Sequence, residues 1–287
     1  MSAWNGRWEY RSVDDFLNDR PAGVRGVYNI NNNDFDFVNG TPSATVAILE
    51  TGLYAQDKYR VSNKLTITAG IRLDAQFLTD ELPVSQEVMN TPEFSQFDDK
   101  LSRKPQFNPR LGFNYTLDEN NKFKLRGGTG LFSGRIPYLW FAYSEYISGT
   151  EYFNIDIRPG GAVTPLTENL ADLQSIQPNL TEINLIDKDF TIPREWKTNL
   201  ALEAKLPKRW TVNLEYTYTE VLKGLFFQSI NRRDDFANFQ GADNRPYYTQ
   251  TGNAIKINPN FTKVFLLTNT DQGYRYNVSF SIPKVTL

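Results

Sequence analysis

The chain has 287 residues, of which 22% are charged and 14% aromatic, with a net charge of −2 and a mean hydropathy of −0.50. It contains no cysteine and no histidine, which excludes disulfides, thiol chemistry, histidine-based catalysis and the usual zinc sites. The near-neutral charge does not indicate nucleic-acid binding, and no segment approaches the ~18 uninterrupted apolar residues of a transmembrane helix. We expect no cofactor and no metal ion.

The N-terminal part predicts little regular structure. The aromatic residues among the first positions are typical of a strand end, and residues 12–18 predict a short helix with Ser12 as its N-cap. Residues 29–43, rich in asparagine, aspartate and glycine, predict a loop. We therefore divide the chain into a strand end with an extracellular loop at 1–43 and a strand region at 44–287. The first residues lack the apolar core of a signal peptide, so we expect an internal fragment or a chain whose signal is missing.

Residues 44–77 have the clearest pattern and predict one long β-hairpin with a turn at residues 62–64. In its second arm, apolar and polar residues alternate, so one face of the strand is apolar and the other is polar and charged. A strand that crosses a bilayer needs about 9–11 residues, against about 5–6 for an ordinary strand, and this arm is long enough to cross. The apolar positions of the second arm are Leu65, Ile67, Ala69, Ile71, Leu73, Ala75 and Phe77.

The same alternation returns in later segments that short turns and long loops connect. The alternating segments are 111–117, 123–131, 196–206, 210–218 and 274–282. Short turns are predicted near 118–121 and 207–209, and long irregular loops at 78–106, 133–193 and 223–260. Residues 264–269 either cross the membrane or form an arm above it.

Alternation alone also fits a half-solvated soluble sheet, so the choice of fold rests on two other features. Connections of a few residues alternate with much longer ones, as in barrels with short periplasmic turns and long extracellular loops. Aromatic residues lie toward the ends of the apolar faces, where a membrane-interface girdle would sit. These features favour an all-β, antiparallel transmembrane β-barrel in the outer membrane of a Gram-negative bacterium. The aromatic residues are Tyr59, Phe77, Trp196, Trp210, Tyr216 and Tyr218.

The barrel is expected to be incomplete. About seven or eight strands, as many as the pattern predicts, could in principle close into a narrow barrel. The charged polar faces and the very long loops suit a wide, polar lumen better. We therefore expect an arc of a larger barrel.

Several segments resemble TonB-dependent outer-membrane receptors. Residues 53–59 (LYAQDKY) and 65–74 (LTITAGIRLD) resemble a hairpin of that family, and residues 108–115 (NPRLGFNY) resemble its next strand. Residues 125–138 (LRGGTGLFSGRIPY) resemble a version common in Bacteroidota receptors that carry a carboxypeptidase-regulatory-like N-terminal extension. The resemblance covers most of residues 44–287.

The resemblance implies a barrel of about 22 strands with a globular plug inside. Such receptors bring iron chelates, vitamins, glycans or peptides across the outer membrane, and the inner-membrane TonB complex supplies the energy by pulling on a short N-terminal box. The implied partners are outer-membrane lipid, the plug, the TonB complex and a surface lipoprotein. This sequence has no segment that matches the plug, the TonB box or the terminal aromatic residue, so the chain alone is expected not to transport by this mechanism.

Charged residues on the polar faces are predicted to face the lumen. In a complete receptor they would hydrogen-bond to the plug; alternatively, they are ordinary wall residues that pair with one another. The run Gly127–Gly130 lies in mid-strand and lacks the lysine and spacing of a phosphate-binding loop, so we expect it to let the strand coil or let a plug approach closely. The lumen-facing residues are Arg72, Asp74, Arg110, Lys124 and Arg126.

The segment that enters the longest loop carries aromatic residues and an arginine. Aromatic faces stack on sugars and grip peptide side chains, and arginine binds carboxylates, so we hypothesise a ligand contact here. Loop packing or an interface girdle is the alternative interpretation. The residues are Arg135, Tyr138, Trp140, Phe141, Tyr143 and Tyr146.

The sequence thus predicts the barrel part of a TonB-dependent transporter for a scarce nutrient, namely an iron chelate, a glycan or a peptide. The alternative function is that of a secreted soluble β-sandwich that binds glycans as a module or adhesin. We expect no enzymatic activity, because adjacent carboxylates such as Asp234 and Asp235 do not by themselves flank a glycosidic bond.

Overall fold

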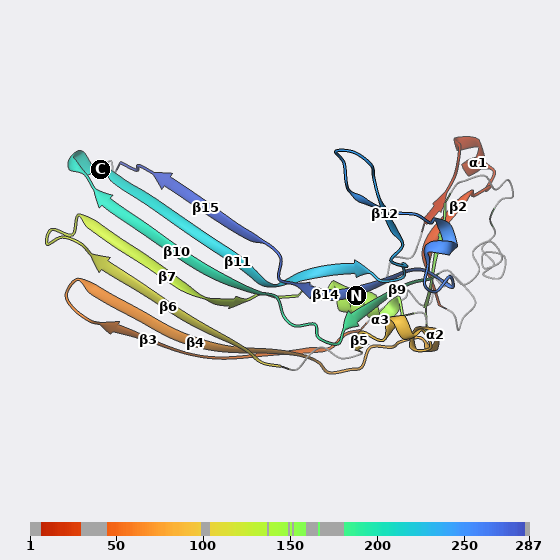
Figure 1. Cartoon of the computed structure of the whole chain (residues 1–287), viewed down its shortest axis with the longest axis horizontal. Helices are drawn as coiled ribbons and strands as arrows, with labels where there is room; N and C mark the ends of the chain where they lie inside the picture. Colours follow the sequence, from red (N-terminus) through yellow and green to blue (C-terminus); the bar gives the residue numbers. More distant parts are fainter. Residues whose placement is uncertain are drawn as a thin grey trace.

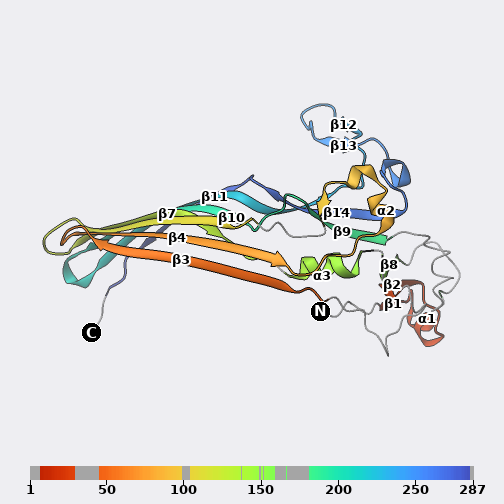
Figure 2. The ribbon, with the colours of Figure 1, turned by 90° about the horizontal axis from the view of Figure 1, so that it is seen from below.

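The computed structural model describes residues 7–29, 45–98, 104–136, 138–148, 150, 152–158, 166 and 181–284. These residues form a long, bent antiparallel sheet with a cap of shorter strands and helices at one end (Figures 1 and 2). The predicted all-β fold is confirmed. The long sheet does not close on itself within the described residues, because one edge strand pairs only with its hairpin partner and the other only with its single neighbour. None of the described helices is long and apolar enough to span a membrane.

The long sheet contains seven strands of the described chain, each antiparallel to the next. In sheet order they are β3 (Ile48–Arg60), β4 (Leu65–Leu78), β6 (Gln106–Thr116), β7 (Phe123–Ser133), β10 (Arg194–Lys205), β11 (Thr211–Ser229) and β15 (Tyr274–Ser281). Tight connections lie at one end of this sheet and the cap lies at the other (Figure 1).

The predicted hairpin is formed by β3 and β4. Leu53 pairs with Leu73 and Ala55 pairs with Ile71, so the apolar residues of the two arms lie on one face. The exposed fraction of Leu53 is 75% and that of Leu73 is 41%, so this apolar face is not covered by protein. The strands have 13 and 14 residues, which is more than a tilted membrane crossing of about 9–11 residues requires.

The turn between β6 and β7 is organised by one side chain. The Asp118 carboxylate accepts hydrogen bonds from the backbone N–H groups of Asn120, Lys122 and Phe123 at 3.2, 2.8 and 2.8 Å. The bond from Phe123 contributes most to holding the pKa of Asp118 below its ordinary value. Asn121 adopts a φ of 55°, a left-handed conformation that asparagine tolerates well. The predicted short turn is therefore confirmed.

The open question about residues 264–269 is settled by the pairing of β11. This strand has 19 residues and pairs first with β15 and then, from Gly224 onward, with β14 (Phe261–Thr270). Residues 271–273 separate β14 from β15, and Gly273 has a φ of 124°, which favours glycine. Residues 264–269 are thus an arm of the cap that continues along the same edge of β11.

The connections predicted as irregular loops contain regular structure in the cap. The short strand β9 (Thr181–Asp187) runs parallel to β14, and β5 (Phe97–Asp98) pairs with β9. The predicted loop at 223–260 also begins too early, because β11 extends to Ser229. The short helix η2 (Pro207–Arg209) forms the turn between β10 and β11. The other cap elements are α2 (Gln86–Met89), η1 (Pro92–Phe94), α3 (Leu139–Tyr146), β12 (Phe236–Asn238), β13 (Pro246–Tyr248) and η3 (Gly252–Ile255).

The hydrophobic core of the described chain lies mainly in the cap. Ile186 and Leu267 belong to a cluster with Phe141 on one face of the β9–β14 pair. Ile183 and Leu266 belong to a second cluster on the other face. Full burial of such side chains contributes about 1.5–3 kcal/mol each, so these two clusters hold the cap together.

The N-terminal residues form a separate small sheet. Strand β1 (Arg7–Glu9) pairs with β2 (Gly23–Asn29), which pairs with β8 (Tyr152–Ile157). Helix α1 (Val13–Leu17) lies between β1 and β2, and the side chain of Ser12 caps it by accepting the backbone N–H of Asp15 at 3.0 Å. The predicted helix and its N-cap are confirmed. Most of the predicted loop at 29–43 lies outside the described residues.

Candidate functional site

The residues predicted to face the lumen lie on the polar face of the long sheet. Arg72 bonds to Asp74, with 2.6 Å between Nε and Oδ1. One guanidinium nitrogen of Arg126 lies 3.8 Å from the Glu215 carboxylate, and Lys124 pairs in register with Glu203 on β10. Arg110 rests over the Phe132 ring, with its Cζ 4.5 Å from the ring centroid. These contacts are with neighbouring wall residues, and hydrogen bonds to a plug stay a prediction.

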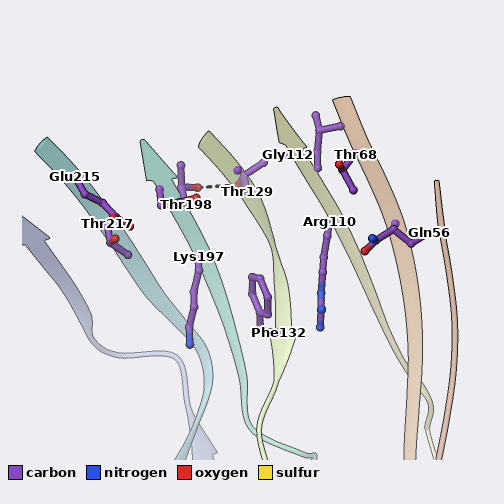
Figure 3. Close-up of a pocket in the computed structure, with 14 residues that line it drawn as sticks. Gln56, Thr68, Arg110, Gly112, Thr129, Phe132, Lys197, Thr198, Glu215 and Thr217 are labelled. Carbon is purple, nitrogen blue, oxygen red and sulfur yellow. Dashed lines mark hydrogen bonds between the residues drawn. The ribbon is translucent and has the colours of Figure 1, made fainter. Parts of the chain in front are cut away.

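A shallow hollow of about 430 Å³ lies on this polar face. Gly112 and Gly128 are paired opposite each other across β6 and β7, so the backbone is bare in the middle of the hollow. A Cβ atom on Gly128 would lie 3.1 Å from the Leu111 carbonyl oxygen, which leaves little room for a side chain. In Figure 3 the Phe132 ring lies between the side chains of Arg110 and Lys197. The Lys197 Nζ is 5.7 Å from the ring centroid, so two cations flank one aromatic ring beside bare backbone.

A buried row of polar side chains crosses the sheet next to this hollow. Asn108 is fully buried and donates to Asp74 at 2.9 Å and to the Ser133 hydroxyl at 2.8 Å. Ser133 in turn donates to Gln106 at 2.8 Å, and Gln106 donates to the Ile192 carbonyl at 2.7 Å. Side chains therefore link strands β4, β6 and β7 to one another and to Ile192, two residues before β10 begins.

A second hollow, which we call the rim hollow, lies where the sheet meets the cap and has a volume of about 380 Å³. Glu50 lies in its wall and accepts hydrogen bonds from the Gln76 amide and from the Tyr138 hydroxyl, the latter at 2.6 Å. The bond to Glu50 raises the pKa of Tyr138, because a carboxylate next to the hydroxyl disfavours the phenolate. The charged and amide side chains that line the rim hollow are Glu50, Arg72, Asp74, Gln76, Arg110 and Arg135.

The aromatic segment is divided between core and surface. Phe141 is completely buried in the cap core, whereas Tyr138 is exposed. Trp140 packs partly against the same core, with its ring centroid 5.6 Å from that of Phe227. Tyr143 and Trp140 line a third hollow of about 280 Å³ together with Phe227, Glu182 and Asn184. The side chain of Tyr146 lies outside the described part of the structure.

The structure thus splits the predicted ligand-binding set between two places. Arg135 lines the rim hollow, with Tyr138 on its border, whereas Trp140 and Tyr143 line the third hollow. Sequence reasoning did not find Glu50, Gln76 or Phe227, which come from strands far away in the chain. Within the described ranges, no group of three or more acidic, histidine or cysteine residues is arranged to hold a metal ion.

Comparisons with solved structures give receptors of low sequence identity. The chain is similar to the siderophore receptor PirA from Pseudomonas aeruginosa, with 14% identity and a TM-score of 0.42 over 82% of this chain and 31% of that one. The chain is also similar to the FrpB iron transporter from Neisseria meningitidis (F5-1 variant), with 13% identity and a TM-score of 0.41 over 98% of this chain and 28% of that one. A third similar structure is the Serratia marcescens hemophore receptor HasR in complex with its hemophore HasA and heme. Its identity is 11% and its TM-score 0.40, over 90% of this chain and 39% of that one.

The chain therefore spans between about a quarter and two fifths of the length of the receptors that it matches. A comparison with curated protein sequences gave no significant match. The family model described as "Outer membrane beta barrel domain" matches residues 3–279, which is nearly the whole chain. The chain belongs to the outer membrane β-barrel domain family, and its place is in an outer membrane.

Proposed function

We propose that the chain is part of the wall and outer cap of a TonB-dependent transporter that takes up a scarce nutrient, namely an iron chelate, a glycan or a peptide. One observation carries the proposal: an uncovered apolar face lies opposite a charged face across the long sheet. A wall with lipid on one side and a wet lumen on the other requires this division. The resemblance of the hairpin to that of TonB-dependent receptors supports the same function.

The apolar face has the features that lipid contact demands. Leu53, Leu111 and Leu200 have exposed fractions of 75%, 53% and 47%, although they lie within long regular strands. Three polar side chains on this face are satisfied by one another: Thr129 bonds to Thr198 at 2.8 Å (Figure 3), and the Trp196 indole donates to Thr129 at 2.7 Å. A soluble β-sandwich would cover these leucines with a second sheet, so we do not favour the glycan-binding module or adhesin.

The polar face supports the proposed partners inside the barrel. We propose that a plug approaches the bare backbone at Gly112 and Gly128, where no side chain stands in its way. The TonB complex would act through that plug, and a surface lipoprotein would meet the cap. The Bacteroidota type with a carboxypeptidase-regulatory-like extension rests on the resemblance of residues 125–138. We propose a transport function and no enzymatic one.

The cap supplies the proposed ligand contacts. Arg135 and Tyr138 at the rim hollow, and Trp140 and Tyr143 at the third hollow, are the side chains with surface open to a solute. Phe141 is buried, so we assign it the task of holding α3 in place. We retain Tyr146 in the proposed set as the last residue of α3.

The proposal is tested by nutrient uptake in the cell that carries the protein. We expect uptake to fall when Trp140 and Tyr143 are both replaced by alanine, and to stop when TonB is removed. A matched control replaces Phe236 and Tyr247, which are exposed aromatic residues on the β12–β13 hairpin of the cap. Uptake that continues without TonB, or a purified chain that stays monodisperse without detergent, would overturn the proposal.

A further inference from the structure

The rim hollow contains more arginines than its own carboxylates neutralise. Arg72, Arg110 and Arg135 line it, together with the carboxylates of Glu50 and Asp74. Arg72 is bound to Asp74, and Glu50 accepts its hydrogen bonds from the neutral donors Gln76 and Tyr138. In the part of the chain that the structure describes, neither Arg110 nor Arg135 forms an ion pair with a carboxylate. Two guanidinium groups therefore face one hollow with their charges uncompensated by a direct partner.

Arg110 is held by an aromatic ring, and its guanidinium donates no hydrogen bond to another described residue. Its Cζ lies 4.5 Å from the Phe132 ring centroid, and the side chain extends alongside that ring (Figure 3). Stacking on an aromatic face leaves the edge of the planar guanidinium available, and that edge fits a carboxylate in a bidentate manner. A cation that is already oriented loses less conformational entropy when it binds an anion.

A buried acceptor in the same hollow lacks a donor. Gln76 is 4% exposed, and its amide nitrogen donates to Glu50. Its carbonyl oxygen Oε1 has no hydrogen-bond partner among the described residues. An unsatisfied buried polar atom costs about 1–3 kcal/mol, so such an atom beside a hollow indicates a position for a bound donor.

From this arrangement we infer that the rim hollow binds a carboxylate that stands next to a hydroxyl or ammonium group. Arg110 and Arg135 would bind the carboxylate, while Gln76 Oε1 and Glu50 accept from the neighbouring donor. Sugar acids and unblocked amino acids or peptides share this chemistry. The inference rests on the proposed function, since it names the class of nutrient that passes this hollow.

The experiment measures binding by isothermal titration to the full chain folded in LDAO micelles. The charged probes are D-glucuronate and L-alanyl-L-alanine, and their neutral counterparts are D-glucose and the N-acetylated dipeptide amide. We expect one charged probe to bind at least about tenfold more tightly than its counterpart, because charge-assisted hydrogen bonds are the strong ones. Its affinity should fall as sodium chloride is added. The probe that binds distinguishes the sugar-acid source from the peptide source.

The two arginines are tested by substitution. The R110Q/R135Q variant should bind the charged probe at least about tenfold more weakly, and each single variant should show part of this loss. The R60Q variant is the matched control, because Arg60 ends β3 at the opposite end of the sheet, where it contacts Asn63 at 3.3 Å. Heat-dependent migration in gels reports folding of every variant.

Two results would overturn the inference. The first is a folded chain that binds neither charged probe better than its counterpart. The second is an R110Q/R135Q variant that is folded and binds as tightly as the original chain. In both cases TonB-dependent uptake would remain testable in the cell, so failure of this inference is distinguishable from failure of the transporter proposal.

Discussion

The hydroxyl of Tyr138 donates a 2.6 Å hydrogen bond to the carboxylate of Glu50, 88 positions earlier in the chain. This bond ties the entry of α3 to the cap end of β3. Because Gln76 on β4 donates to the same carboxylate, one acidic side chain joins the first hairpin of the wall to the cap. The position of the proposed ligand contacts therefore depends on Glu50, a residue outside the aromatic segment.

Replacing Tyr138 with phenylalanine should loosen α3 and leave the long strands folded. The exposed hydrogen bond contributes about 1 kcal/mol, and Phe141 still anchors the helix in the core. Hydrogen exchange should therefore be faster in residues 138–146 of the variant and unchanged in β4. Faster exchange throughout the sheet would contradict this description of the tether, and so would an unchanged exchange rate in α3.

The same tether should be lost in alkali. The raised pKa of Tyr138 means that the folded state favours the neutral phenol, so its stabilising effect is complete below the ordinary tyrosine pKa. The effect then disappears as the pH rises through the raised value. The original chain should show this loss of α3 protection and the Tyr138→Phe variant should not, which hydrogen exchange at several alkaline pH values would measure.

Glu87 should make one contact in the cap sensitive to acid. Its carboxylate accepts hydrogen bonds from the side chains of Asn260 at 2.7 Å and Asn258 at 3.1 Å, which lower its pKa. A carboxyl with a lowered pKa stabilises the fold above its ordinary value and loses this effect as the pH falls through the folded value. Limited proteolysis near α2 should increase in acid in the original chain. The Glu87→Gln variant carries no titrating group at this position, so the protease should cleave it equally fast at neutral and acidic pH.

Two glycines, Gly112 on β6 and Gly127 on β7, should differ in their tolerance of a methyl group. A Cβ on Gly127 would lie 2.8 Å from a ring carbon of Phe113 and 2.9 Å from the Asn199 carbonyl oxygen, whereas on Gly112 its nearest contact would be 3.5 Å. We expect Gly127→Ala to lower the free energy of unfolding by about 1–3 kcal/mol and Gly112→Ala to change it by less than about 1 kcal/mol. Urea unfolding of both variants in lipid vesicles tests the order, and equal effects would contradict it.

A charge on the apolar face should destabilise the inserted chain. Replacing Ile71 with arginine places a cation where we expect hydrocarbon, at a cost of about 2–4 kcal/mol near the bilayer midplane. Gln56→Arg is the control, because Gln56 lies on the polar face beside Gly70. Unfolding in vesicles should separate the two variants; if Ile71→Arg is harmless, that position does not contact lipid.

Periodic segments of the fold were predictable because one physical rule decides them. In β4 the alternation of Ile71, Arg72 and Leu73 gave the correct faces, and the structure pairs these residues with Ala55, Tyr54 and Leu53. A shift of one residue would expose every polar side chain to the wrong solvent, so the register is strongly determined. The same holds for the Ser12 cap, whose effect is local to α1.

The cap was not predictable from such patterns. Strand β9 lies parallel to β14 and is covered on both faces, and its alternation stops at Ile186, so its sequence does not show the long alternating run of a wall strand. For the same reason the aromatic segment could not be divided in advance: Phe141 and Tyr143 differ in burial because of which core lies beneath α3, and no spacing reports that. The rim hollow likewise joins Glu50, Gln76 and Arg135 through contacts between distant segments.

The two-faced wall is tested most directly by spin labels along β4 in lipid bilayers. The chain has no cysteine, so single cysteines can be placed and labelled at each position from 66 to 74. Labels at Ile67, Ala69, Ile71 and Leu73 should be relaxed mainly by oxygen dissolved in the lipid, and those at Thr68 and Arg72 mainly by a water-soluble nickel complex. Accessibility that lacks this period of two residues, or water contact at Ile71 and Leu73, would contradict the membrane-spanning wall.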